Sequence, residues 1–189
     1  MEESSPENDQ SRSLAEALGR VVQNAAALES HLRTLAAALI GSKYAAIVVA
    51  GQPTSNLLET ISALSKVHDQ VSPEKRAELA ELLSRAKVAY KRRNDFAHGT
   101  WAVDPGGAVM SHNSRYRQFD WVKSPVSHAA LTELSKELMD CTVQLLVWSF
   151  ATLPGDISNE AQLRWETYLN SLTPEEREAM IQRRTRGAE

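Results

Sequence analysis

Hydrophobic residues recur along the first forty positions at steps of alternately four and three. The series consists of Leu14, Leu18, Val21, Ala25, Leu28, Leu32, Leu35 and Leu39. Because an α-helix turns once in 3.6 residues, this spacing places the whole series along one side of a helix. The same spacing is typical of a seam between two helices, so it predicts either a core helix of a monomer or a dimer contact. Gly41 follows and predicts the end of this helix.

Two further helices are predicted before residue 100. After the short apolar stretch "AAIVVAG", the segment "TSNLLETISALSKV" has apolar residues at helical spacing, and Thr54 or Ser55 is suited to cap its first turn. The next helix is predicted to begin after Ser72, an N-cap residue, with Pro73 at its first position. It continues through "AYKRRNDFAH", and Gly99 marks its end.

The pattern changes after Gly99. The sequence "DPGG" lies between two short apolar segments and predicts a turn, so a small β-hairpin is expected at about residues 100–122. The segment "SRYRQFDWV" is a candidate third strand. Ser124 or Ser127 then caps another long helix, which Pro154 and Gly155 end.

The pattern predicts a mainly α protein with three parts. Residues 1–11 are expected to be a disordered N-terminal tail, because they are polar and precede the first apolar residue of the helical series. Residues 12–152 are expected to form a helical bundle that includes the hairpin. Residues 153–189 are expected to form a C-terminal helical extension, with short helices at roughly 158–171 and 174–186.

Composition and charge narrow the classes of function. The chain has 189 residues and a formal net charge of −3, so no overall basic field attracts it to nucleic acid. Cys141 is the only cysteine, which rules out a disulfide framework and predicts a buried apolar filler. No apolar run reaches the roughly 20 residues that span a bilayer, and the polar start does not resemble a secretory signal. The chain is therefore expected to be cytoplasmic, with no membrane contact.

Common catalytic signatures are missing from the sequence. It has no Gly-rich phosphate loop, no G-x-S-x-G elbow and no H-E-x-x-H motif. Four of the five histidines are scattered without the spacing of metal ligands, and neither a metal nor another cofactor is predicted. The fifth, His98, has chemically useful neighbours.

The sequence "RNDFAH" closes the helix that ends at Gly99. On a continuous helix Asn94 and Asp95 lie four and three positions before His98, so both can face the imidazole. Arg93 and His98 are five positions apart, which rotates one from the other by about 140° and separates them by about 7.5 Å along the axis. One continuous helix therefore cannot direct both at a small target. Either the helix breaks near Ala97, or a second copy of the chain supplies the missing partner across a two-fold axis.

These six residues, 93–98, resemble the R-x4-6-H motif of HEPN domains. The longer sequence "RNDFAHGTW" is similar to the R-N-x-x-x-H-G-x-W form found in many bacterial HEPN-like proteins. The likeness covers roughly residues 12–152. HEPN domains are compact helical bundles that typically dimerise, and many are metal-independent endoribonucleases of toxin–antitoxin, CRISPR and other defence systems. The resemblance implies an antiparallel HEPN-like bundle, in which the hairpin is an insertion, and a homodimer that acts on RNA.

The resemblance also implies a role for each motif residue. His98 would act as a general base on the RNA 2′-hydroxyl or as a general acid for the leaving oxygen, since imidazole exchanges protons near neutral pH. Arg93 would hold the scissile phosphate and stabilise its developing charge with a planar set of donors. Asn94 would orient His98 or the phosphate. Cleavage would leave a 2′,3′-cyclic phosphate and need no metal.

Basic residues near the motif are candidates for RNA binding. Lys87, Lys91 and Arg92 lie on the approach to the motif and are suited to phosphate contacts. In "RYRQFDW", Arg115 and Arg117 alternate with aromatic residues that can stack on unpaired bases. The same alternation predicts a half-buried strand whose aromatic residues pack on the bundle, and this second interpretation is the stronger one.

A non-catalytic function is the alternative. An inert HEPN-like dimer would use Arg93 and His98 for structure or for binding a nucleotide, nucleic acid or protein. The charged last helix, "PEEREAMIQRRTR", is most simply a solvated terminal helix, and a contact with RNA or with an antitoxin or regulatory protein partner is the weaker interpretation. Exposure separates these alternatives, since catalysis requires an accessible His98 and a structural role predicts a buried one. Trp101 directly follows the helix end and is predicted to anchor the outgoing chain to the core.

Overall fold

The computed structural model describes residues 6–104, 107–113, 121–153 and 173–174 of the chain. This part is mainly helical and also contains a small antiparallel sheet. In chain order the elements are α1 (Pro6–Ile40), α2 (Ala45–Val49), α3 (Thr54–Val67), α4 (Pro73–His98), β1 (Thr100–Asp104), β2 (Gly107–Asn113), β3 (Trp121–Pro125) and α5 (His128–Thr152).

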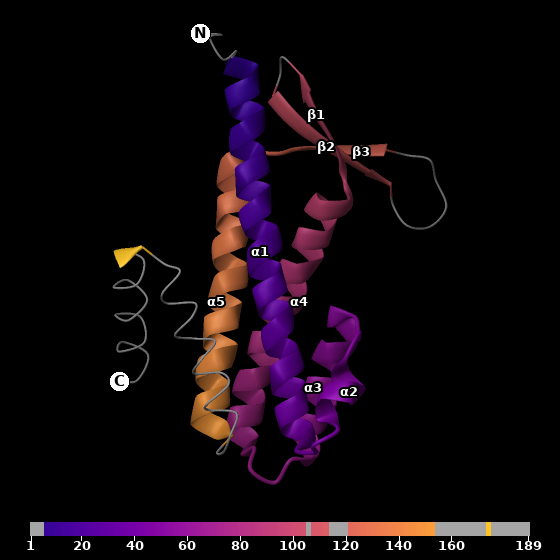
Figure 1. Cartoon of the computed structure of the whole chain (residues 1–189), viewed down its shortest axis with the longest axis vertical. Coiled ribbons are helices and arrows are strands. Elements are labelled where there is room, and N and C mark those ends of the chain that lie inside the picture. The colour runs from indigo at the N-terminus through magenta and orange to yellow at the C-terminus, as the bar shows by residue number, and fades with distance from the viewer. Residues whose placement is uncertain (1–5, 105–106, 114–120, 154–172, 175–189) are drawn as a thin grey trace.

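The helices form one elongated bundle (Figure 1). The long helices α1 and α5 lie side by side and make the most extensive contact between any two helices. Helix α4 packs on α5, whereas α3 and α2 pack on α1. The sheet lies at the end of the bundle where α4 finishes and α5 begins (Figure 1). The C-terminal turn of α4, which carries the RNDFAH motif, is therefore next to the sheet.

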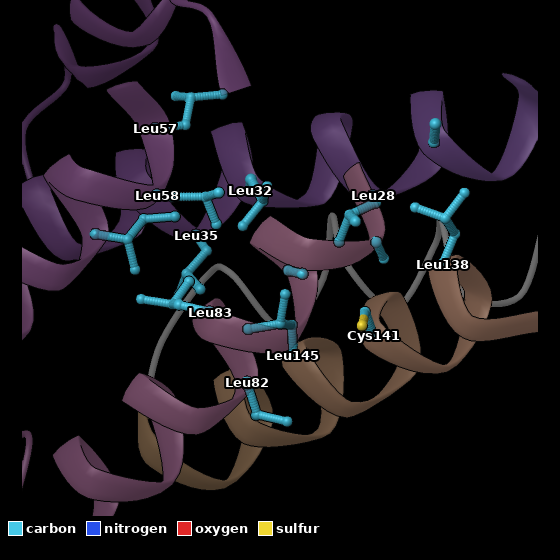
Figure 2. Close-up of a cluster of buried hydrophobic side chains, with 14 of the residues drawn as sticks. Leu28, Leu32, Leu35, Leu57, Leu58, Leu82, Leu83, Leu138, Cys141 and Leu145 are labelled. Carbon is cyan, nitrogen blue, oxygen red and sulfur yellow. The ribbon is translucent and has the colours of Figure 1, made fainter. Parts of the chain in front are cut away.

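The apolar series on α1 belongs to the core of a single chain. Seven of its eight residues are buried, and Leu18 packs partly buried against the same cluster. Leucines from α1, α3, α4 and α5 point into this cluster, as Figure 2 shows for Leu28, Leu58, Leu83 and Leu145. Other helices of the same chain cover this side of α1, so it is not free to form a dimer contact. The interpretation as a core helix within one chain is confirmed.

Local sequence signals fix several helix ends. Gly41 adopts φ +63° after α1, a left-handed conformation that glycine tolerates at a helix end. The hydroxyl oxygen of Ser72 accepts the backbone N–H of Lys75 and caps α4, as predicted. Ser127 caps α5 by the same kind of bond from Ala130, which decides between the two predicted caps.

Other predicted boundaries were wrong. Neither Thr54 nor Ser55 caps α3, because Thr54 is already the first helical residue and Pro53 occupies the cap position without a side-chain bond. Helix α1 begins at Pro6, earlier than the predicted start at residue 12, and proline is tolerated in a first turn because its missing N–H has no partner there. The stretch "AAIVV" forms the short helix α2, which periodicity did not predict. The extension predicted for residues 153–189 lies almost wholly outside the described residues.

The sheet has the strand order β1-β2-β3, and both pairs are antiparallel. Asp104 pairs with Gly107 at the end of β1 and β2, and the two turn residues between them lie outside the described part. The candidate third strand at 114–122 overlaps β3 only at its end, because β3 begins at Trp121. Its residues 114–120, including Arg115 and Arg117, also lie outside the described part of the chain.

Cys141 is buried in the core cluster, as predicted, and its sulfur lies among the leucines of Figure 2. Burial raises the pKa of its thiol to about 11, because the thiolate is poorly solvated there. We expect the native protein to resist labelling by a disulfide reagent at pH 8 and the unfolded protein to react fully. Rapid labelling of the native protein, measured by thionitrobenzoate release, would contradict this packing.

Candidate functional site

The motif occupies the last turns of an unbroken helix. Helix α4 continues through His98, and the backbone N–H of Gly99 still donates to the carbonyl of Asp95 at 3.1 Å. The predicted break near Ala97 is therefore wrong. Since α4 remains helical, Arg93 and His98 point in directions about 140° apart. Within one chain they do not converge on one target.

His98 is exposed at the end of α4. Among the described residues it makes no hydrogen bond or ion pair with Asn94 or Asp95, although the helical spacing allows both. Asp95 is also exposed. The imidazole is thus accessible to a ligand, but Asn94 does not orient it, contrary to one of the predicted roles.

Arg93 is half-buried and is held on two sides. Its Nη1 donates to the side-chain oxygen of Asn94 at 2.9 Å. Its guanidinium carbon lies 5.4 Å from the centre of the Tyr90 ring, within the range of a cation–π interaction. Its Nε is enclosed and has no hydrogen-bond partner in the described part of the chain. Asn94 therefore positions the arginine rather than the histidine.

Tyr90 in turn belongs to a polar cluster that joins three helices. Its hydroxyl donates to Oε2 of Glu29 on α1 at 2.5 Å. The same oxygen accepts the hydroxyl of Thr54 on α3 at 3.2 Å, and the other oxygen of Glu29 pairs with Arg33. This arrangement explains why Thr54 is not a helix cap, since its hydroxyl is used between helices.

The cluster shifts the acidity of two of its members. Burial alone raises the pKa of Glu29, but the hydrogen bond from Tyr90 and the charge and hydrogen bond of Arg33 outweigh it, so the pKa lies below the ordinary 4.5. Burial raises the pKa of Tyr90, and its hydrogen bond to the Glu29 carboxylate raises it further. Both shifts favour a charged Glu29 that accepts a hydrogen bond from a neutral Tyr90.

The lowered pKa of Glu29 predicts a stability that depends on pH. The ionised form stabilises the folded state above pH 4.5, and this contribution is lost as the pH falls through the lower folded-state pKa. We expect Glu29→Gln to reduce the free energy of unfolding near neutral pH by about 1 to 3 kcal/mol. The difference from wild type should shrink in acid. Urea unfolding at a series of pH values measures it, with the exposed Glu81→Gln as the control; a difference that is constant with pH would contradict the assignment.

The predicted RNA-binding residues have different surroundings. Lys87 and Lys91 are exposed on α4. Arg92 instead pairs with Glu137 of α5, with 2.7 Å between Nη1 and Oε2, so it contributes to helix packing as well as to surface charge. Arg115 and Arg117 lie outside the described residues.

Trp101 anchors the chain where it leaves α4. Its indole N–H donates to the carbonyl of Phe96 at 2.8 Å, and the two rings lie 6.1 Å apart at a tilt of 48°. Both rings pack against the core cluster. The predicted anchoring role is confirmed, and it fixes the sheet to the motif turn.

Sequence reasoning missed Glu29, Tyr90 and Thr54. One signal was available for Tyr90, which precedes Arg93 by three positions and so lies on the same face of α4. Glu29 lies between Leu28 and Leu32 of the core series, where a carboxylate requires a partner. No pattern in the sequence indicates that this partner comes from α4.

The described part of the chain has a hollow away from the motif, between the C-terminal ends of α1 and α3. It is lined by residues 39–41, 64 and 67–70, none of which belongs to the motif.

The described residues contain no group of three His, Cys, Asp or Glu side chains that could hold a metal ion. None of the described helices combines the length and apolar character of a membrane span.

Comparisons of this chain with protein-family models, with curated proteins and with solved structures found no match.

Proposed function

We propose that the protein is a metal-independent endoribonuclease of HEPN type, which cleaves RNA at a site shared between two copies of the chain. The observation that carries the proposal is the exposed His98 on the same continuous helix end as Arg93. An accessible imidazole is what acid–base catalysis requires. The fixed guanidinium of Arg93 supports the proposed phosphate contact, because planar donors suit phosphate oxygens.

The proposed reaction needs only these side chains. His98 of one copy takes the proton of the RNA 2′-hydroxyl, and the 2′-oxygen forms a bond to the adjacent phosphorus. The bond from phosphorus to the 5′-oxygen breaks, and that oxygen takes a proton from water, while the His98 imidazolium returns its own proton to the solvent. The products are a 2′,3′-cyclic phosphate and a 5′-hydroxyl. Arg93 stabilises the negative charge that builds up on the phosphate oxygens.

The directions of Arg93 and His98 support the shared site. One copy of α4 cannot bring both groups to one phosphate, whereas two copies related by a two-fold axis supply each group twice. The α1 series is covered within the chain, so the proposed contact region is the end of α4 that carries Arg93 and His98, with the exposed Lys87 and Lys91 on the approach to it. The two lysines would guide the RNA backbone to it. The resemblance suggests a bacterial toxin–antitoxin or phage-defence setting, with an antitoxin or regulatory protein as a further partner.

A second candidate is an inert HEPN-like dimer that binds a nucleotide, nucleic acid or protein. One observation favours it, namely that Arg93 is half-buried and already held by Tyr90 and Asn94. An arginine with a purely structural role would have these contacts. The two candidates differ in whether Arg93 is needed for cleavage or only for folding.

The test is incubation with single-stranded RNA in excess EDTA, followed by analysis of the product ends. We expect the wild type to leave 2′,3′-cyclic phosphate and 5′-hydroxyl ends. We expect Arg93→Ala to lose activity by about 100- to 1,000-fold, the usual effect of removing a donor that stabilises transition-state charge. Arg20→Ala, at an exposed arginine of α1, controls for the loss of a positive charge. A folded wild type with no cleavage of any RNA tested would favour the inert dimer.

A further inference from the structure

We propose that Glu29 and Tyr90 are positioning residues, which hold the Arg93 guanidinium in the orientation that meets the RNA phosphate. The consequence for catalysis rests on the proposed function, since Arg93 is the proposed phosphate contact there. The positioning itself is a property of the folded chain and can be measured without RNA.

The first step is the contact between Tyr90 and Arg93. The two residues are three positions apart on α4 and so lie on one face of the helix. The guanidinium carbon is 5.4 Å from the ring centre, where the negative face of the ring attracts the cation. Asn94 accepts from Nη1 on the other side. The ring and the amide together restrict how the guanidinium can turn.

The second step is the fixed position of the ring. A tyrosine ring with a free hydroxyl can swing about its first side-chain torsion, but the hydroxyl of Tyr90 is bonded to Glu29 on α1 at 2.5 Å. Glu29 cannot move easily either, because Thr54 and Arg33 donate to its two oxygens. The neighbouring core residue Leu28 is fully buried and fixes this part of α1.

The third step is the environment of Arg93 itself. Its Nε is enclosed and lacks a hydrogen-bond partner among the described residues. A buried donor without a partner costs free energy, because it has lost its hydrogen bonds to water. The contacts with Tyr90 and Asn94 must offset this cost for the observed orientation to persist. Loss of the ring should therefore release the arginine, not merely weaken one contact.

Three variants test the contacts of Arg93, Tyr90 and Glu29 separately. Tyr90→Leu removes both the ring face and the hydroxyl. Tyr90→Phe keeps the ring and removes the bond to Glu29, and Glu29→Gln keeps an acceptor without the charge. The control is Tyr44→Leu, because Tyr44 also has a cation near its ring, Lys43 at 5.0 Å, but is 60% exposed and lies in a different part of the bundle.

The direct readout is the Nε–Hε signal of Arg93 in a nitrogen-15 NMR spectrum. This signal is identified because it is absent from the spectrum of Arg93→Lys. We expect a separate signal in wild type and in Tyr44→Leu. In Tyr90→Leu it should move into the group of exposed arginines, and Tyr90→Phe should give a smaller shift. A signal unchanged in a folded Tyr90→Leu protein overturns the positioning role. If Tyr90→Leu does not fold, the same judgement rests on Tyr90→Phe and Glu29→Gln, which keep the packing.

The kinetic readout tests the consequence. We expect Tyr90→Leu to reduce kcat by about 10- to 100-fold, as misplacement of a catalytic group does, with little change in KM. Tyr90→Phe, which keeps the ring and loses the bond to Glu29, should have a kcat between those of Tyr90→Leu and the wild type. A moved Arg93 signal with unchanged kcat would overturn the catalytic consequence. If the wild type cleaves no RNA, the proposed function fails, whereas the NMR result still decides whether Glu29 and Tyr90 hold Arg93.

Discussion

Replacing His98 by alanine is expected to reduce the rate of RNA cleavage by about 100- to 10,000-fold, the usual contribution of a general acid or base. The side chain is exposed and makes no bond that holds α4 in the described part of the chain, so its removal should leave the fold unchanged. Initial rates on single-stranded RNA in EDTA measure the effect, and circular dichroism checks the fold.

The matched control is His128→Ala. His128 is also an exposed histidine at the end of a helix, but it begins α5 and is not part of the motif. We expect this variant to cleave at the wild-type rate. Equal losses in both variants would indicate an indirect effect on the protein, and a fully active His98→Ala would remove the histidine from the mechanism.

Replacing Trp148 by alanine is expected to lower the free energy of unfolding by about 3 to 5 kcal/mol, the range for large aromatic residues in protein cores. Trp148 is the largest fully buried side chain among the described residues, with 1% of its surface exposed. Its indole N–H also donates to the carbonyl of Lys75 at 2.9 Å and so joins α5 to the first turn of α4. The alanine variant loses the packing and leaves this carbonyl without its partner.

Urea unfolding followed by circular dichroism measures this loss. Phe150→Ala is the control, because Phe150 lies two positions further along α5 and is 38% exposed. Its replacement should cost much less. If Trp148→Ala and Phe150→Ala had similar stabilities, the packing of α5 on α4 would be contradicted.

Periodicity and capping residues predicted much of the bundle. The series on α1 and the caps at Ser72 and Ser127 depend on interactions within a few residues, which a sequence displays directly. On α5 the apolar Phe150 turns towards solvent, whereas Trp148 and Cys141 face the core. Which apolar residues of a helix face the core depends on the helices packed around it, and the spacing of residues alone does not show this.

The candidate site was predictable only in part. The motif residues follow from the sequence, and so does the angle between Arg93 and His98 on a continuous helix. The cluster that holds Arg93 does not, because Glu29, Thr54 and Tyr90 come from three helices far apart in the chain. Their meeting depends on tertiary packing, and the structure also shows that Asn94 bonds Arg93 instead of His98.

The central claim is that Arg93 of one copy works with His98 of another. Mixing the purified Arg93→Ala and His98→Ala variants, under conditions in which subunits exchange, tests it most directly. In a mixed dimer one copy retains Arg93 and the other retains His98, so a shared site is complete although neither variant is active alone. We predict that mixing restores RNA cleavage in EDTA. A mixture that exchanges subunits and remains as inactive as its two components would contradict the shared site.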